Sequence, residues 1–339
     1  MPDTLRKFLN KLLRRENLSR EEASELLKAL LSKDATDAQI AAILVALAAK
    51  GETTDELQGM VEVMRSMAVR INAGHVKFVD TAGTGSSIAK TFNVSTATAF
   101  VIAGAGLPVA KHGNRAASSN SGSADVLTAL GVNVQALPDV SEKCLNTLGI
   151  CFMFAPLYHG ATARVASVRR ELGVQTVFNL LGPLSNPAAA PRQIVGVWRK
   201  DLVDRLARVL AALGTEHTWV VHGEDGLDEI TVSGRTHVAE AKGGTVKAFV
   251  VEPEDFGVGR GTMDHLRGGD AASNARIIRG VLSGLRRDEA RSLVVANAGA
   301  VLFVGGMAGN LLASAELAEK SIDSGAAQRK LEDLIQATN

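Results

Sequence analysis

The chain has 339 residues, of which 46% are hydrophobic and 22% are charged, a composition typical of a folded soluble protein rather than a disordered one. Its 37 basic side chains are balanced by 36 acidic ones and only 4% of residues are aromatic, which argues against nucleic-acid partners. The charged N-terminus, the lack of a long apolar run and two cysteines, Cys144 and Cys151, predict a cytoplasmic protein with reduced core thiols and no membrane partner.

Residues 1–72 predict a small all-helical domain. Apolar residues recur at helical spacing from Leu5 to Leu13, and three further apolar stripes follow. Each of those three begins with a capping-box pair, namely Ser19 with Glu22, Thr36 with Gln39, and Thr53 with Glu56. Such stripes usually form a core, and any apolar surface left over would suit the interface of a homodimer.

The pattern changes near Gly74 to short apolar runs that end in glycine turns. Strands are predicted at 78–80, 107–110, 151–154, 194–198, 218–221, 236–240 and 247–251. Helices are predicted from Ser95 and over 123–130, 160–190, 201–213, 288–303 and 311–324, with 255–269 as a surface loop. Strands that alternate with helices predict an α/β domain with a mostly parallel central sheet. We expect this domain to cover 73–161 and 192–339, with a segment at about 162–191 returning to the helical domain.

Polar residues gather where these strands end, which is where ligands of parallel sheets bind. Gly83-Thr84-Gly85 allows backbone N–H groups to approach an anion, although such a turn alone is a weak signal. Amide, hydroxyl and cationic side chains follow at Asn93, Ser95, Thr96, Lys111, Arg115, Ser118, Ser119 and Ser123. This set predicts a phosphate-rich ligand.

Asp228 and Glu229 follow a strand and a glycine turn, and adjacent carboxylates suit Mg²⁺ that also binds substrate phosphates. The alternative is a solvated acidic turn. Neither a Walker sequence nor the full dinucleotide-binding motif occurs, and the seven histidines lack zinc-site spacing.

Four motifs together resemble the anthranilate phosphoribosyltransferases over nearly the whole chain. They are Lys111-His112-Gly113-Asn114-Arg115, Ser121-Gly122-Ser123-Ala124-Asp125, Phe178-Asn179-Leu180-Leu181-Gly182-Pro183 with Asn186-Pro187, and Leu227-Asp228-Glu229. The resemblance implies transfer of the phosphoribosyl group of phosphoribosyl pyrophosphate to anthranilate, the second step of tryptophan biosynthesis from chorismate. It also implies a homodimer and Mg²⁺, with two ions expected alongside the pyrophosphate.

The resemblance also implies roles for individual residues. Those expected at phosphoribosyl pyrophosphate are Gly83, Ser86, Ser87, Thr91, Asn93, Val94, Ser95, Thr96, Lys111, Arg115, Ser118, Ser119 and Ser123. Ser95, Asp228 and Glu229 would serve Mg²⁺, and Lys111, Asp228 and Glu229 would support the transition state. Those expected at anthranilate are Gly83, His112, Asn114, His159, Arg169, Gly182 and Pro183, with Arg169 clamping the carboxylate.

The chain departs from the family at one place, because Gly83-Thr84-Gly85-Ser86-Ser87 stands where the family usually reads Gly-Thr-Gly-Gly-Asp. Losing a glycine is expected to reshape the loop, and losing a carboxylate to reduce repulsion of a polyanion. Two alternatives share the architecture, namely a pyrimidine nucleoside phosphorylase-like enzyme and a non-catalytic nucleic-acid-binding relative. The near-neutral charge and the Asp228-Glu229 pair argue against the second.

Overall fold

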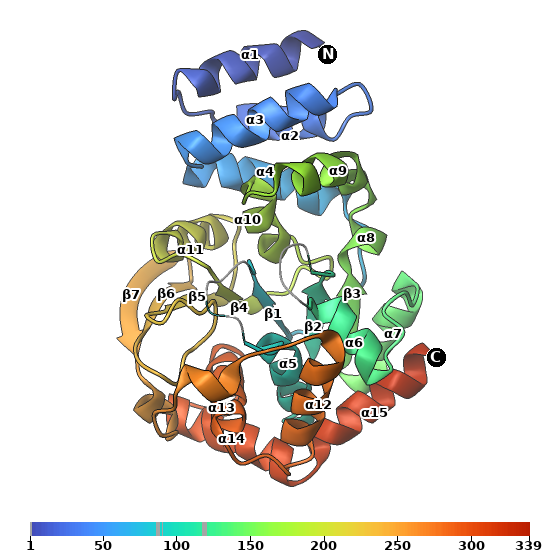
Figure 1. Ribbon diagram of the computed structural model, residues 1–339, viewed down its shortest axis with the longest axis vertical. Coiled ribbons are helices and arrows are strands. Elements are labelled where there is room, and N and C mark those ends of the chain that lie inside the picture. The colour runs from blue at the N-terminus through green and yellow to red at the C-terminus, as the bar shows by residue number, and fades with distance from the viewer. Residues whose placement is uncertain (1, 86–88, 90, 117–120) are drawn as a thin grey trace.

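The structure is a computed structural model that describes residues 2–85, 89, 91–116 and 121–339. Helices α1 (Pro2–Leu13), α2 (Arg20–Leu30), α3 (Asp37–Lys50) and α4 (Thr54–Met67) lie together at one end of the molecule (Figure 1). The returning helices α9 (Ala163–Leu172) and α10 (Val177–Leu184) pack against α3 and α4. All three predicted capping boxes are present at the starts of α2, α3 and α4, which confirms that local sequence signals start these helices.

The rest of the chain surrounds a seven-stranded sheet with the order β3-β2-β1-β4-β5-β6-β7. Its strands are β1 (Val79–Gly83), β2 (Val109–Gly113), β3 (Ile150–Phe154), β4 (Arg192–Gly196), β5 (His217–Gly223), β6 (Thr236–Lys242) and β7 (Thr245–Val251). The strands from β1 to β5 are parallel, and β6 and β7 add an antiparallel edge. The predicted fold class is therefore confirmed, and strand order reverses between β1 and β4.

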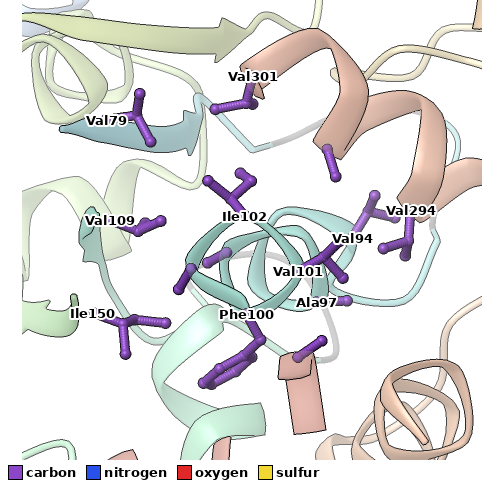
Figure 2. Packing of buried hydrophobic residues seen from close by; sticks show 14 of the residues in the cluster. Val79, Val94, Ala97, Phe100, Val101, Ile102, Val109, Ile150, Val294 and Val301 are labelled. Atoms are coloured by element: carbon purple, nitrogen blue, oxygen red, sulfur yellow. The ribbon is translucent and has the colours of Figure 1, made fainter. Parts of the chain in front are cut away.

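The helices of the α/β part are α5 (Val94–Gly104), α6 (Ser123–Leu130), α7 (Pro138–Leu148), α8 (Ala155–Tyr158), α11 (Leu202–Ala212), α12 (Ala271–Leu282), α13 (Glu289–Val304), α14 (Leu311–Asp323) and α15 (Ala326–Thr338). Helix α11 packs against β5 and β6, and α5 lies between β1 and α13. Figure 2 shows Phe100, Val101 and Ile102 of α5 at the centre of this core. Because α5 is apolar on every side, it is buried along its length and its N-terminus is held in a fixed place.

Several predicted boundaries were wrong. Strand β1 continues past Asp80 to Gly83, and β2 begins at Val109 and continues to Gly113, so polar residues expected in turns lie in the sheet. The segment 255–269 is not merely a surface loop, because it contains the short helix η3 (Met263–Leu266), buries Leu266 and pairs Arg267 with Thr91. The stretch expected to be helical at 160–190 is broken into η1 (Gly160–Thr162), α9 and α10. Helices α12 and α15 were not predicted.

None of the helices within the described ranges combines the length and the apolar character needed to cross a membrane.

Candidate functional site

The candidate site forms where the order of the parallel strands reverses, at the carboxyl ends of β1 and β4. The last residues of these strands, Gly83 and Gly196, are partners in the sheet. The Thr84 N–H donates to the Gly196 carbonyl at 2.9 Å, which carries the chain across the end of β4. In open α/β sheets ligands bind at such a reversal.

Asp228, the first residue of the Asp228-Glu229 pair, lies directly over these two glycines. A methyl group at Gly196 would lie 1.7 Å from the Asp228 carbonyl oxygen, and one at Gly83 would lie 3.1 Å from Asp228 Oδ2. The loop is fixed on one side by Asp225, which accepts from the Leu227 N–H at 3.1 Å. On the other side Asn297 of α13 accepts from the Ile230 N–H at 2.9 Å and donates to the Ile230 carbonyl at 2.8 Å. Both carboxylates therefore stand on a fixed backbone.

Replacing Gly196 by alanine is expected to lower the free energy of unfolding by about 3 kcal/mol and to reduce turnover, because the added methyl group overlaps backbone atoms of Asp228. Urea unfolding and steady-state rates would measure both effects. Gly309→Ala is the matched control, since its methyl group would meet nothing within 4 Å, and it should change stability by less than about 0.5 kcal/mol. Equal behaviour of the two variants would contradict the close approach.

Lys111 of β2 connects strand β1 with the start of helix α5. Its Nζ donates to the Thr81 carbonyl at 2.7 Å and lies 3.3 Å from Ser95 Oγ. The Ser95 backbone N–H donates to Glu229, so the start of α5 touches both the cation and the acid. Burial lowers the pKa of Lys111, while the charges of Asp80 and Glu229 oppose that shift.

The two neighbouring acids carry raised pKa values. Burial, followed by the charge of Asp228, raises the pKa of Glu229 to about 8, against the attraction of Lys111. Burial raises the pKa of Asp80 to about 6, although Lys111 and hydrogen bonds lower it. Glu229 is therefore mostly protonated near pH 7 in this structure, and a further cation would favour its ionised form.

Asn93 and the start of α6 form the neighbouring part of the site. Asn93 Nδ2 donates to the Ser121 carbonyl at 3.1 Å. Arg115 pairs with Asp125 at 2.8 Å, and Asp125 also accepts from the N–H groups of Ala116 and Gly122. In this structure Arg115 is therefore used in an ion pair with Asp125 of α6. Asp125 thereby connects Arg115, Ala116 and Gly122 at the N-terminus of α6, where Ser123 lies.

His112 and His159 lie side by side, with ring centroids 5.1 Å apart. Burial lowers the pKa of His112 to about 3, and burial also lowers the pKa of His159. His159 Nε2 donates to the Ser185 carbonyl at 3.1 Å, and His112 interacts with the backbone of Gly182, the residue before Pro183 in α10. Both rings are therefore neutral near pH 7 and buried, and the charge of Lys111 lies near His112.

Arg169 of α9 stacks on Phe178 of α10, with its guanidinium carbon 5.1 Å from the ring centroid. Burial lowers the pKa of Arg169. In the part of the chain that the structure describes, no carboxylate pairs with it. A half-buried arginine whose guanidinium N–H groups have no carboxylate partner suits a planar carboxylate ligand.

The other residues predicted at the site differ in their burial and in their contacts. Val94, which is labelled in Figure 2, packs its side chain in the core and donates its N–H to the Phe92 carbonyl. Thr96 is fully buried. Thr91 pairs with Arg267, and Asn114 is exposed after β2. Ser86, Ser87, Ser118 and Ser119 lie outside the described residues.

Sequence reasoning missed three residues that hold the site in place, namely Gly196, Asn274 and Asn297. Asn274 lies in α12, whose start did carry a recognisable cap, because Asp270 accepts from the Ser273 N–H at 2.8 Å. Gly196 and Asn297 carried no local signal, since their contacts with Asp228 and Ile230 join distant parts of the chain.

Comparison with known families gives two matches that follow one another along the chain. Residues 6–68 match the family described as "Glycosyl transferase family, helical bundle domain", and residues 75–328 match "Glycosyl transferase family, a/b domain". Among curated proteins, the anthranilate phosphoribosyltransferase of Anaeromyxobacter dehalogenans is 52% identical and that of Desulfosudis oleivorans 49% identical, each over 97% of both chains.

Solved structures agree with these matches. The anthranilate phosphoribosyltransferase of Thermus thermophilus superposes with a TM-score of 0.91 at 37% identity, covering 97% of this chain and 98% of that one. The Saccharomyces cerevisiae enzyme in complex with phosphoribosyl pyrophosphate and Mg also gives 0.91, at 28% identity, covering 100% of this chain and 98% of that one.

Proposed function

The chain belongs to the anthranilate phosphoribosyltransferase family, and from that premise we propose that it makes N-(5-phosphoribosyl)anthranilate and pyrophosphate, with Mg²⁺, as the second step of tryptophan biosynthesis from chorismate. In this reaction the anthranilate nitrogen uses its lone pair to bond the ribose anomeric carbon. Pyrophosphate leaves with the electrons of the broken C–O bond, and one N–H proton is released. An aniline nitrogen needs no strong base, so positioning and charge stabilisation are the main tasks.

The observation that carries this proposal is the fixed Asp228-Glu229 pair above the strand reversal, joined to Lys111 through Ser95. We assign phosphoribosyl pyrophosphate to this part of the molecule, with Gly83, Asn93, Ser95 and Lys111 around it. Lys111 offers a buried ammonium to the departing pyrophosphate. A buried cation stabilises such charge more than an exposed one would.

The residues present fit Mg²⁺. Burial and the charge of Asp228 raise the pKa of Glu229 to about 8, and a divalent cation bound there would favour the ionised carboxylate. Asp228, Glu229 and the Ser95 hydroxyl offer oxygen ligands, and within the described residues no cluster of three His, Cys, Asp or Glu completes a closed metal site. Mg²⁺ that bridges a substrate pyrophosphate needs no closed site. When bound, the metal neutralises the leaving group, and we propose two ions there.

Anthranilate is assigned to the neighbouring surface formed by His112, His159, Arg169 and the end of α10 at Gly182-Pro183, next to Asn114. The neutral histidines offer aromatic surface to the anthranilate ring without a competing charge. Arg169 offers its fork to the anthranilate carboxylate. The amine would then approach the ribose near Lys111, whose charge lies close enough to His112 to help lower its pKa.

Arg169→Ala is expected to raise the KM for anthranilate by about 10- to 100-fold, the effect of losing a charge-assisted hydrogen bond. The KM for phosphoribosyl pyrophosphate should change little, since Arg169 stacks on Phe178 of the helical segment rather than near Lys111. Steady-state rates followed by anthranilate fluorescence would measure both constants. Arg169→Lys keeps the charge but not the fork, so it should restore only part of the affinity.

Arg170→Ala is the matched control, because the adjacent Arg170 is exposed. An equal rise of both KM values in Arg169→Ala, or the same rise in Arg170→Ala, would contradict the assignment.

The function itself is tested by mixing the protein with anthranilate, phosphoribosyl pyrophosphate and Mg²⁺ and following the loss of anthranilate fluorescence. Consumption that requires all three components supports the proposal. Binding of phosphoribosyl pyrophosphate without consumption of anthranilate would indicate another acceptor and would overturn it.

We further propose a homodimer formed through the helical domain, with domain limits at 1–72 and about 162–191 for that domain and at 73–161 and 192–339 for the α/β domain. Leu13 of α1 and Val45 of α3 support the interface, because they are 67% and 45% exposed on the helical domain. We place the enzyme in the cytoplasm, an assignment supported by the unpaired buried thiols of Cys144 and Cys151.

A further inference from the structure

The first turn of α12 carries a buried asparagine that bonds to a residue of the phosphoribosyl pyrophosphate site. Asn274 is 2% exposed, and its Nδ2 donates to Asn93 Oδ1 at 3.1 Å across 181 positions of the chain. Asn93 precedes α5 but makes no capping hydrogen bond with its side chain, although asparagine is a preferred capping residue. Its amide bonds instead to Ser121 and Asn274.

Two backbone groups decide which way both amides point. The Gly269 N–H can only donate, and it donates to Asn274 Oδ1 at 2.8 Å, so Asn274 must turn its nitrogen to Asn93. The Ser121 carbonyl can only accept, and it accepts from Asn93 Nδ2 at 3.1 Å. Asn93 Oδ1 then faces Asn274 Nδ2, and the Ser121 hydroxyl also donates to that oxygen at 3.3 Å. The orientation of each amide follows from these fixed partners.

In this arrangement the group of Asn93 that is left to bind a ligand is an N–H. Its oxygen accepts two hydrogen bonds and one of its N–H groups is used, while the second N–H has no partner among the residues that the structure describes. The loop that binds Asn274 also pairs Arg267 with Thr91, so α12 and α5 are tied together at this point. An N–H group suits the oxygens of a phosphate or a ribose.

We propose that Asn274 is a positioning residue that fixes the Asn93 amide with its nitrogen toward phosphoribosyl pyrophosphate. This inference rests on the proposed function for the identity of the ligand. Reversing the Asn93 amide would turn an oxygen toward the same ligand atoms, and two acceptors repel. Asn274 thereby sets affinity for the phosphoribosyl donor without touching it.

Asn274→Asp tests the inference, because aspartate still accepts from the Gly269 N–H but turns a second oxygen toward Asn93 Oδ1. The dissociation constant for phosphoribosyl pyrophosphate with Mg²⁺, measured by calorimetry, is expected to rise about 10- to 100-fold. The KM for anthranilate should stay within about twofold. Asn274→Ala, which introduces no charge, should give a smaller rise and serves if the aspartate variant does not fold.

Ser321→Ala is the matched control, because the Ser321 hydroxyl donates to the Val101 carbonyl near the opposite end of α5. It should destabilise the same helix and leave the dissociation constant unchanged. In an Asn93→Ala background, Asn274→Asp should have no further effect on binding, since the group it orients is gone.

Wild-type affinity in both Asn274 variants would overturn the inference, and so would an Asn274→Asp effect that persists in Asn93→Ala. A wild-type protein that binds phosphoribosyl pyrophosphate but leaves anthranilate unchanged would overturn the proposed function instead. The two failures are thus told apart by the binding measurement.

Discussion

The variant in which Asp228 and Glu229 are both alanine is expected to lose Mg²⁺-dependent turnover, with kcat/KM falling by at least about 1,000-fold. The two carboxylates stand on a backbone held by Asp225 and Asn297. Of the described acids, only Asp80 also lies beside Lys111, and it is buried within the sheet. Steady-state rates over a range of Mg²⁺ concentrations would measure the loss.

Loss of folding can be separated from loss of chemistry with Glu229→Gln. Glu229 has a folded pKa of about 8, above its unfolded value, so its charge opposes folding increasingly as pH rises toward 8. The glutamine variant should therefore gain stability relative to the wild type between about pH 5 and pH 8, while its turnover falls. Thermal unfolding across that range measures the first effect.

Glu224→Gln is the matched control for this loop, since Glu224 is exposed and lies 3.3 Å from His237 on the other side. It should keep wild-type rates. Wild-type Mg²⁺ dependence in the double-alanine variant would exclude the proposed role of the pair.

Local signals in the sequence predicted the elements whose ends depend only on nearby residues. The capping boxes at Ser19, Thr36 and Thr53 start their helices as expected, and Gly131 ends α6 with the positive φ that glycine allows. Strand ends were less predictable, because hydrogen bonds between strands decide them. The register of β1 with β4 extends β1 to Gly83, although Thr81 and Gly83 look like turn residues.

The candidate site was predictable in its residue types but not in its supports. Ser95, Lys111 and Glu229 could be named because a phosphate ligand needs such groups and the family motifs contain them, and the structure brings these three together. Asn274 and Asn297 could not be named, because a buried asparagine in a helix has no sequence signature. Each makes a hydrogen bond to a residue more than sixty positions away, an arrangement that only the folded chain shows.

Lys111→Met is expected to lower kcat by about 100-fold and to raise the KM for phosphoribosyl pyrophosphate, because it removes the buried ammonium that we propose stabilises the leaving group. Methionine keeps much of the length and bulk of lysine. The Thr81 carbonyl, which accepts from Lys111 at 2.7 Å, loses that donor but keeps its place in the sheet. Initial rates with each substrate varied in turn would separate the two effects.

The same variant should change how stability depends on pH, and this checks that Lys111 interacts with the buried acids Asp80 and Glu229. Lys111 lowers the pKa of Asp80, which burial raises to about 6 in the wild type. Without the ammonium this pKa rises further. As the pH increases, the free energy of unfolding then keeps falling up to a higher pH than in the wild type. The unfolding temperature of the variant relative to the wild type should therefore drop between about pH 6 and pH 8. A difference that stays constant over that range would mean that Lys111 interacts with neither acid, and the ammonium would then have to be placed elsewhere.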